Sequence, residues 1–222
     1  VIVAANERKA RELLADYRMY DKEAVFYPAK DVIFYSADVH GNAVETERLK
    51  TIKSLFDQEG GTVITTMTAG MEYVQSLSVY KKSCRRLEEG GQVDLEELTR
   101  SLADMGYERQ GQVDGPGEYS IRGGILDIYP PTGECPYRIE LWGDEIDTIR
   151  SFDVESQRSM ENLEEITIYP AAEPIPDEKE ETVSFLDYFA PGKSLIFLDE
   201  PTRILEKGRS VEKEFEESIL NA

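Results

Sequence analysis

The residues with the clearest chemical signature are Asp199 and Glu200, which follow the apolar run 194–198 (SLIFL). An acidic pair at the end of a buried strand is typical of a Walker B motif, where carboxylates hold Mg²⁺ and orient water. The motif needs a Walker A loop, GxxxxGK[ST], whose backbone amides cradle the phosphates. Residues 192–194 (GKS) match only its end, because Asp187 stands at the first glycine position and a strand follows instead of a helix. We therefore interpret Asp199 and Glu200 as vestigial, and expect no cofactor and no enzymatic activity in this chain.

Other residue types used in catalysis are scarce. The single histidine, His40, lies beside Gly41 in a predicted loop, where histidines are usually solvated. Cys84 and Cys135 are far apart in the sequence and have no clustered histidine, so we expect both to be structural thiols. The chain has no zinc-protease or nucleophile-elbow motif. We expect neither a catalytic residue nor a metal site.

The arginines are more informative. Between residues 85 and 158 the chain has eight arginines and no lysine, and arginine is favoured where planar or bidentate contacts matter. Alternation along the predicted strand 137–142 places Arg138, Glu140 and Trp142 on one face. The same alternation places Arg122 opposite Ile121, while the following glycines 123–124 are expected to allow a β-bulge.

A sheet face that carries Arg122, Arg138, Glu140 and Trp142 has the composition of a protein-interface hot spot. The alternative is that Arg138 and Glu140 are solvated strand residues and that Trp142 merely covers a hairpin. The spacing of the residues leaves both interpretations open.

The elements of the N-terminal third alternate between strands and helices, which predicts a parallel sheet with right-handed crossovers. The apolar run 194–198 is expected to rejoin this sheet. The predicted elements are a strand at 1–4, a helix capped by Asn6 and running to Tyr17, a strand at 24–27, a helix at 42–58 and a strand at 62–67.

The middle of the chain follows a different pattern. Asp94 is a predicted N-cap, with Glu97 as its capping-box partner, and Gly106 ends the helix. Four closely spaced strands follow, at 118–129, 137–142, 146–152 and 165–169. The fold class expected is α/β, with an inserted α+β domain made of one helix and an antiparallel meander. The expected domains are 1–78, 79–169 and 170–222, the last opening with an acidic linker at 173–181.

Composition limits the class of protein. The 222 residues carry 25 basic and 45 acidic side chains, a net charge of −20, with 40% hydrophobic residues. This composition is globular, and the strong acidity argues against a freestanding nucleic-acid binder. No apolar run approaches the roughly 18 residues of a membrane span, so no membrane contact and a cytoplasmic location are expected. Val1 in place of Met indicates that position 1 is not a natural start.

Three blocks of sequence resemble the N-terminal, UvrB-homology region of the bacterial transcription-repair coupling factors, the Mfd family. They are EYSIRGGILDIYP at 118–130, YRIELWGDEID at 137–147 and SFDVESQRS at 151–159. The blocks also resemble UvrB more loosely, and the segment 184–201 resembles the stretch around the UvrB Walker B motif. The resemblance extends from Val1 to about Ala222.

The resemblance implies a degenerate P-loop helicase-like domain whose α+β insert binds UvrA. It further implies that the UvrA-binding residues are Arg109, Arg122, Arg138 and Glu140, with Trp142 on the same face. Glu140 is expected either to orient Arg122 or to meet a cation of UvrA. Members of the family displace stalled RNA polymerase and recruit UvrA, so the expected function is a non-catalytic recruitment module for nucleotide excision repair. RNA polymerase and DNA would be contacted only through parts absent from this chain.

Two other functions remain possible. A fragment of a UvrB-type ATPase would need a P-loop before Val1 and a tyrosine-rich hairpin after 26–28, where none is present, and Pro201 departs from the UvrB pattern. An autoinhibitory clamp would dock the same face on other domains of the full-length chain.

The link 172–185 is shorter than in typical family members.

Overall fold

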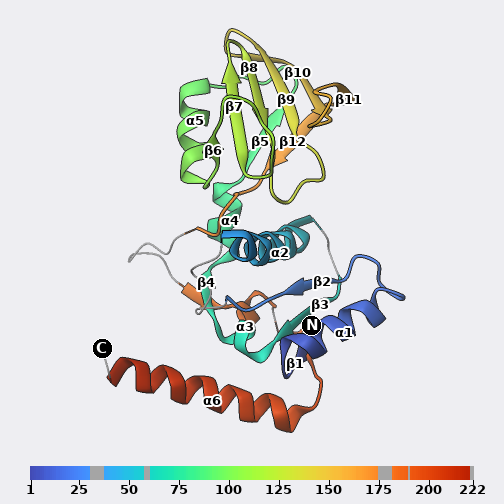
Figure 1. The fold of residues 1–222 in the computed structure, drawn as a ribbon, viewed down its shortest axis with the longest axis vertical. Coiled ribbons are helices and arrows are strands. Elements are labelled where there is room, and N and C mark those ends of the chain that lie inside the picture. Colours follow the sequence, from blue (N-terminus) through green and yellow to red (C-terminus); the bar gives the residue numbers. More distant parts are fainter. Residues whose placement is uncertain (31–37, 58–60, 175–181, 190, 221–222) are drawn as a thin grey trace. The chain divides into compact units, whose positions relative to one another are not determined.

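The computed structural model describes residues 1–30, 38–57, 61–174, 182–189 and 191–220. The chain forms two compact units, one made of Val1–Leu77 with Pro176–Ala222 and the other of Ser78–Ile175 (Figure 1). Each unit contains its own cluster of buried apolar side chains, around Ile64 in the first and around Leu126 in the second. The fold is therefore mixed α/β, with parallel and antiparallel sheets. Residues 175–181, which make up most of the predicted linker and half of the short link, lie outside the described residues.

The first unit is built on a parallel sheet with strand order β14-β1-β3-β2. Ile2 pairs with Phe197 on one side and with Ile64 on the other, which confirms that the run 194–198 rejoins the first sheet. Only two residues of that run are in a strand. The bounds are β1 Ile2–Ala4, β2 Val25–Tyr27, β3 Val63–Thr66 and β14 Phe197–Leu198.

Helix α1 (Glu7–Tyr17) begins as predicted, since the Asn6 side chain accepts a hydrogen bond from the backbone of Lys9 at 3.0 Å. Helix α2 (Asp38–Asp57) begins earlier than predicted, so His40 lies in a helix and its loop assignment is wrong. Glycine at position 41 costs a helix about 1 kcal/mol, and the burial of Leu49 and Ile52 outweighs that cost. The remaining elements are α3 Met67–Met71, β4 Tyr73–Gln75, β13 Thr182–Ser184, the 3₁₀ helix η1 Phe185–Tyr188 and α6 Pro201–Leu220.

The second unit is built on a six-stranded sheet with order β11-β10-β9-β8-β7-β6. Every pair is antiparallel except β6 and β7, which are parallel. The bounds are α4 Leu77–Ser83, β5 Arg85–Glu88, α5 Leu95–Asp104, β6 Glu108–Arg109, β7 Glu118–Arg122, β8 Ile125–Ile128, β9 Tyr137–Trp142, β10 Glu145–Phe152, β11 Ser159–Leu163 and β12 Glu165–Ile168.

Helix α5 covers one face of this sheet (Figure 1). Asp94 caps it as predicted, because its carboxylate accepts hydrogen bonds from the backbone of Glu96 and Glu97 at 2.8 and 3.0 Å. Gly106, with φ +86°, ends it. Leu98 and Leu102 pack in one cluster with strand residues. The opposite face of the sheet carries no helix in the described part of this unit (Figure 1).

Two predictions about the strands are wrong. The predicted strand 118–129 is a hairpin of β7 and β8, with the glycines 123–124 as a two-residue turn and not a bulge. Gly123 has φ +62°, the left-handed conformation that tight hairpin turns require. Strand β12 leaves the meander and pairs with β5, a strand that sequence patterns did not indicate.

Candidate partner-binding surface

The register of the six-stranded sheet brings five charged residues to the face opposite α5. Asp127 on β8 pairs with Arg138 on β9, and Arg138 pairs in turn with Arg150 on β10. Cross-strand partners project to the same side of an antiparallel sheet, and the neighbouring apolar residues therefore face α5. We call this surface the polar sheet face, and it consists of Arg122, Asp127, Arg138, Glu140 and Arg150.

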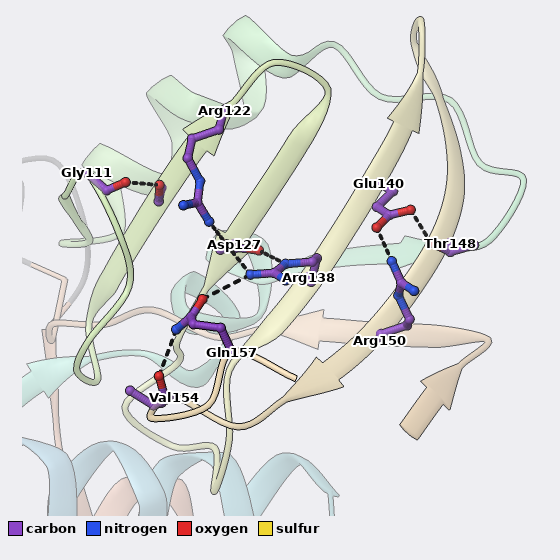
Figure 2. Close-up of polar contacts among 10 residues, drawn as sticks. Gly111, Arg122, Asp127, Arg138, Glu140, Thr148, Arg150, Val154 and Gln157 are labelled. Atoms are coloured by element: carbon purple, nitrogen blue, oxygen red, sulfur yellow. Dashed lines mark hydrogen bonds and ion pairs between the residues drawn. The ribbon is translucent and has the colours of Figure 1, made fainter. Parts of the chain in front are cut away.

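Asp127 is the centre of the polar sheet face. Its carboxylate accepts hydrogen bonds from Nε and Nη2 of Arg138, at 2.7 and 2.9 Å, and from Nη2 of Arg122, at 2.8 Å (Figure 2). The Asp127 side chain is only 1% exposed. A buried carboxylate is stable when its charge is paired and its oxygens are hydrogen-bonded, and the two guanidinium groups meet both requirements.

Arg138 is held on several sides. Besides Asp127, its Nη2 donates to Oε1 of Gln157 at 3.2 Å, and its guanidinium lies 4.5 Å from the ring centroid of Phe152. The Arg138 side chain is 17% exposed. The hydrogen bonds to Asp127 raise the pKa of Arg138 above its ordinary value, against the opposing effect of desolvation, so it stays charged at physiological pH.

Arg122 is less enclosed. Its side chain is 48% exposed, and within the described residues it forms one ion pair, to Asp127. The prediction that Arg122 lies on a polar face with Arg138 and Glu140 is thus matched by their positions. Of the two arginines bound to Asp127, Arg122 is the more accessible to a partner, because Arg138 is largely covered.

Glu140 pairs with Arg150 through an ion pair, and it also accepts a hydrogen bond from the Thr148 hydroxyl at 3.4 Å (Figure 2). Of the two roles expected for Glu140, orienting Arg122 or meeting a cation of UvrA, the first is not seen, because Arg122 donates to Asp127 instead. The register explains why Glu140 contacts Arg150. Glu140 lies opposite Thr148 on β10, and Arg150 is two residues further along β10 on the same face.

Trp142 lies at the end of β9, and its side chain is exposed. A relative exposure of 85% argues against one part of the alternative suggested by the sequence, namely that Trp142 covers the β9–β10 hairpin. An exposed tryptophan next to an arginine cluster is typical of a protein-binding surface, because indole and guanidinium groups are enriched among hot-spot residues.

Arg109 lies apart from the polar sheet face. It is in register with Tyr119 on β7, whose side chain belongs to the core under α5. Paired residues of parallel strands point to the same side, so Arg109 lies on the helix side of the sheet. It lines an open pocket with residues of α5 and β7, namely Leu95, Glu96, Thr99, Arg100 and Ile121.

Asp199 and Glu200 belong to the other unit, at the end of β14. The Asp199 amide donates to the carbonyl of Val3 at 2.9 Å, which continues the strand pairing. The Glu200 carboxylate accepts from Arg203 at 3.0 Å, one turn along α6. Among the described residues, no group of three or more histidine, cysteine or acidic side chains is arranged to hold a metal ion. None of the described helices is both long and apolar enough to cross a membrane.

Sequence reasoning missed two residues of the polar sheet face, Asp127 and Arg150, and it also missed Gln157, which hydrogen-bonds to Arg138. A signal for Asp127 exists, because an acidic residue interrupts the apolar pattern of 125–128 (ILDI). Had the glycines 123–124 been interpreted as a two-residue turn, the register would place Asp127 opposite Ser120 and on the arginine face. Gln157 has no such signal, since it comes from a loop and reaches Arg138 only through the fold.

Comparison with known proteins identifies this part of the chain. Residues 86–173 match the family described as the UvrB interaction domain. The transcription-repair-coupling factor of Bacillus subtilis is 36% identical over 197 residues, which is 87% of this chain and 17% of that protein. The same factor from Staphylococcus haemolyticus is 34% identical over 175 residues, 78% of this chain and 15% of that protein.

The chain therefore spans about one sixth of the length of the curated relatives it matches. The residues matched by the family, 86–173, include the whole six-stranded sheet and the polar sheet face. The predicted resemblance is confirmed: residues 86–173 match the UvrB interaction domain, in a chain that is similar over most of its length to the transcription-repair coupling factors.

Proposed function

We propose that this chain is a non-catalytic recruitment module that binds UvrA and so brings nucleotide excision repair to a stalled RNA polymerase. The observation that carries the proposal is the polar sheet face, with its ordered arginine pair on Asp127 and the exposed Trp142 nearby. The similarity to transcription-repair coupling factors supports the biological setting. Contacts with RNA polymerase and DNA would belong to parts outside this chain.

Charge supports a protein partner with an acidic surface. The polar sheet face combines three arginines with two carboxylates, whereas the chain as a whole has a net charge of −20. The locally basic patch favours an acidic patch on a partner, and the negative charge of the rest of the chain disfavours binding along extended DNA. Arg122, Arg138 and Glu140 are the proposed contacts on this face, with Trp142 as the apolar anchor. Arg109, on the helix side, would contact UvrA only if the partner reaches around the β6 edge.

The first unit is proposed to be a degenerate P-loop helicase-like domain. Its all-parallel sheet, with β14 beside β1 and an acidic pair after β14, supports that relation. The predicted insert, 79–169, would then be the part that carries the UvrA-binding face, and the acidic pair Asp199 and Glu200 would be a remnant without a nucleotide.

Replacement of Arg138 by alanine tests the proposal. Loss of one partner of a buried, hydrogen-bonded charge pair at an interface typically costs about 2–5 kcal/mol, mostly through faster dissociation. Arg138→Ala should therefore weaken binding to UvrA by well over tenfold, and surface plasmon resonance would show the change mainly in the dissociation rate.

The matched control is Arg86→Ala. Arg86 lies in the same unit, but its ion pair with Glu165 joins β5 and β12 and is solvent-exposed, so its loss should change stability little. The control should bind UvrA like the unmodified chain. An Arg138→Ala chain that is folded and dissociates from UvrA at the unmodified rate would contradict the proposed surface.

A further inference from the structure

We propose that Asp127 is a positioning residue of the partner-binding surface: it fixes the guanidinium of Arg122 in the orientation that receives a carboxylate of the partner, and Arg138 serves as its counter-charge. The inference rests on the proposed function for its binding consequence, but its structural part is testable in the free chain. It gives the two arginines different roles, which the sequence alone does not separate.

The hydrogen bonds of Arg138 indicate a supporting role. Its Nε and Nη2 are engaged by Asp127, and Nη2 is also engaged by Gln157 (Figure 2). The ring of Phe152 covers one face of its guanidinium, and 17% of the side chain is exposed. A guanidinium with two nitrogens and one face already occupied has little capacity left for a bidentate contact with a partner.

Arg122 has the opposite balance. Only its Nη2 is engaged, by Asp127, and in the described part of the chain its Nε and Nη1 have no hydrogen-bond partner. Nη2 carries a second hydrogen, so one edge of the guanidinium, formed by Nη2 with Nε or with Nη1, keeps two parallel N–H groups. With 48% of the side chain exposed, that edge can bind a carboxylate in the bidentate mode. Of the two arginines, Arg122 is therefore the one that can bind a carboxylate in the bidentate mode.

Asp127 makes this arrangement possible in two ways. The Nη2 groups of Arg122 and Arg138 donate to the same carboxylate oxygen, Oδ2, so without the negative charge two cations would repel each other at this point. Anchoring Arg122 before binding also removes part of the rotamer entropy that a free arginine would lose on binding. A preorganised arginine binds more tightly than a mobile one with the same charge.

If Asp127 had a competing role instead, its substitution would change the affinity for the partner in the opposite direction. If Asp127 merely competed with the partner's carboxylates, Asp127→Asn would raise the positive potential of the face and strengthen binding. Preorganisation predicts weaker binding after the same substitution, because Asn has no negative charge and one acceptor oxygen in place of the two that hold the arginines. The direction of the change in affinity separates the two roles.

The binding experiment is a double-mutant cycle on the whole chain with Asp127→Asn, Arg122→Ala and the double variant, measured against UvrA. Asp127→Asn alone should weaken binding about tenfold, within the range of coupling between residues in contact. In the Arg122→Ala background it should change affinity less than about twofold, because its effect acts through Arg122. The control Asp147→Asn removes the same charge from an exposed position of β10 and should leave affinity unchanged.

The orientation of Arg122 is measured without UvrA. In NMR spectra of the free chain, the guanidinium of Arg122 should show slowed rotation, and Asp127→Asn should restore fast rotation, whereas Asp147→Asn should not. If Arg122 is equally mobile in the unmodified and Asp127→Asn chains, the positioning role is wrong, whatever UvrA does. If Arg122 responds as expected but neither chain binds UvrA, the proposed function fails and the positioning role stands.

Arg138→Lys provides a second variant in case Asp127→Asn lowers the folded fraction. Lysine keeps the positive charge next to Asp127 but loses the two-point grip on the carboxylate, so the net charge of the face is unchanged. Binding should weaken severalfold, with the loss again absent in the Arg122→Ala background. Stronger binding of Asp127→Asn, or an equal loss in both backgrounds, would overturn the inference.

Discussion

At the residue scale, Arg122 and Arg138 share one carboxylate yet differ in environment. Alternation along β7 and β9 was sufficient to place both on one face, because the side-chain period of a strand is two residues. It was not sufficient to show which arginine is accessible. That difference depends on Phe152 and Gln157, which approach Arg138 from β10 and from the loop after it.

Cys135 carries a residue-scale prediction about pH. Burial raises the pKa of its thiol, and the carboxylates of Glu134 and Glu161 act in the same direction, against a hydrogen bond with Ser151. Because the thiolate is the reactive form, a raised pKa leaves less thiolate at pH 8. Alkylation of Cys135 by iodoacetamide should therefore be slower in the folded chain than in urea. As the pH is raised, its rate should continue to increase at pH values where the rate of an ordinary thiol no longer changes.

The measurement uses a Cys84→Ser background, which leaves Cys135 as the one remaining thiol of the sequence. Mass spectrometry at a series of pH values gives the rate. A folded chain that reacts as fast as the unfolded one at pH 8 would show that the half-buried position of Cys135 does not slow its alkylation.

At the element scale, the β7–β8 hairpin determines which residues face the partner. The turn is made by Gly123 and Gly124, and the carbonyl of Gly124 accepts a hydrogen bond from the Leu141 amide at 2.7 Å. A Cβ atom at position 124 would lie 2.8 Å from the backbone oxygen of Leu141. Since a backbone atom cannot move aside as a side chain can, the hairpin and β9 can lie this close only with glycine there.

Gly124→Ala should therefore destabilise the chain by about 1–3 kcal/mol, the usual cost of overpacking a well-packed site. Urea denaturation followed by circular dichroism would measure the change. The control is Gly111→Ala, where a Cβ atom meets nothing within 4 Å and the residue does not have a positive φ. It should be neutral or raise stability by up to about 1 kcal/mol. Equal stability of the two variants would contradict the close approach of the hairpin to β9.

Elements with local signals were predicted well. The caps at Asn6 and Asp94 and the stop at Gly106 depend on residues within one turn of the helix end, so the sequence contains the whole signal. The pairing of β5 with β12 was missed because it joins residues 85–88 to residues 165–168, and no local pattern encodes such a distant partner. Asp127 was missed for a related reason, since the hairpin register had to be known first.

At the scale of the whole molecule, the charge distribution distinguishes the polar sheet face from the rest of the surface. A net charge of −20 keeps acidic partners away from most of the chain. The polar sheet face, with one more arginine than carboxylate, is a local exception to that repulsion. Recognition of UvrA through this face would therefore depend on a few desolvated contacts more than on long-range attraction, and it should persist at physiological salt.

The measurement that tests this account most directly is calorimetric titration of the chain into purified UvrA, beside the Arg122→Ala/Arg138→Ala variant. We expect micromolar or tighter binding by the unmodified chain and its loss in the variant, with the circular dichroism spectrum retained. Absence of binding by the folded, unmodified chain, or equal binding by the variant, would contradict the claim that the polar sheet face recruits UvrA.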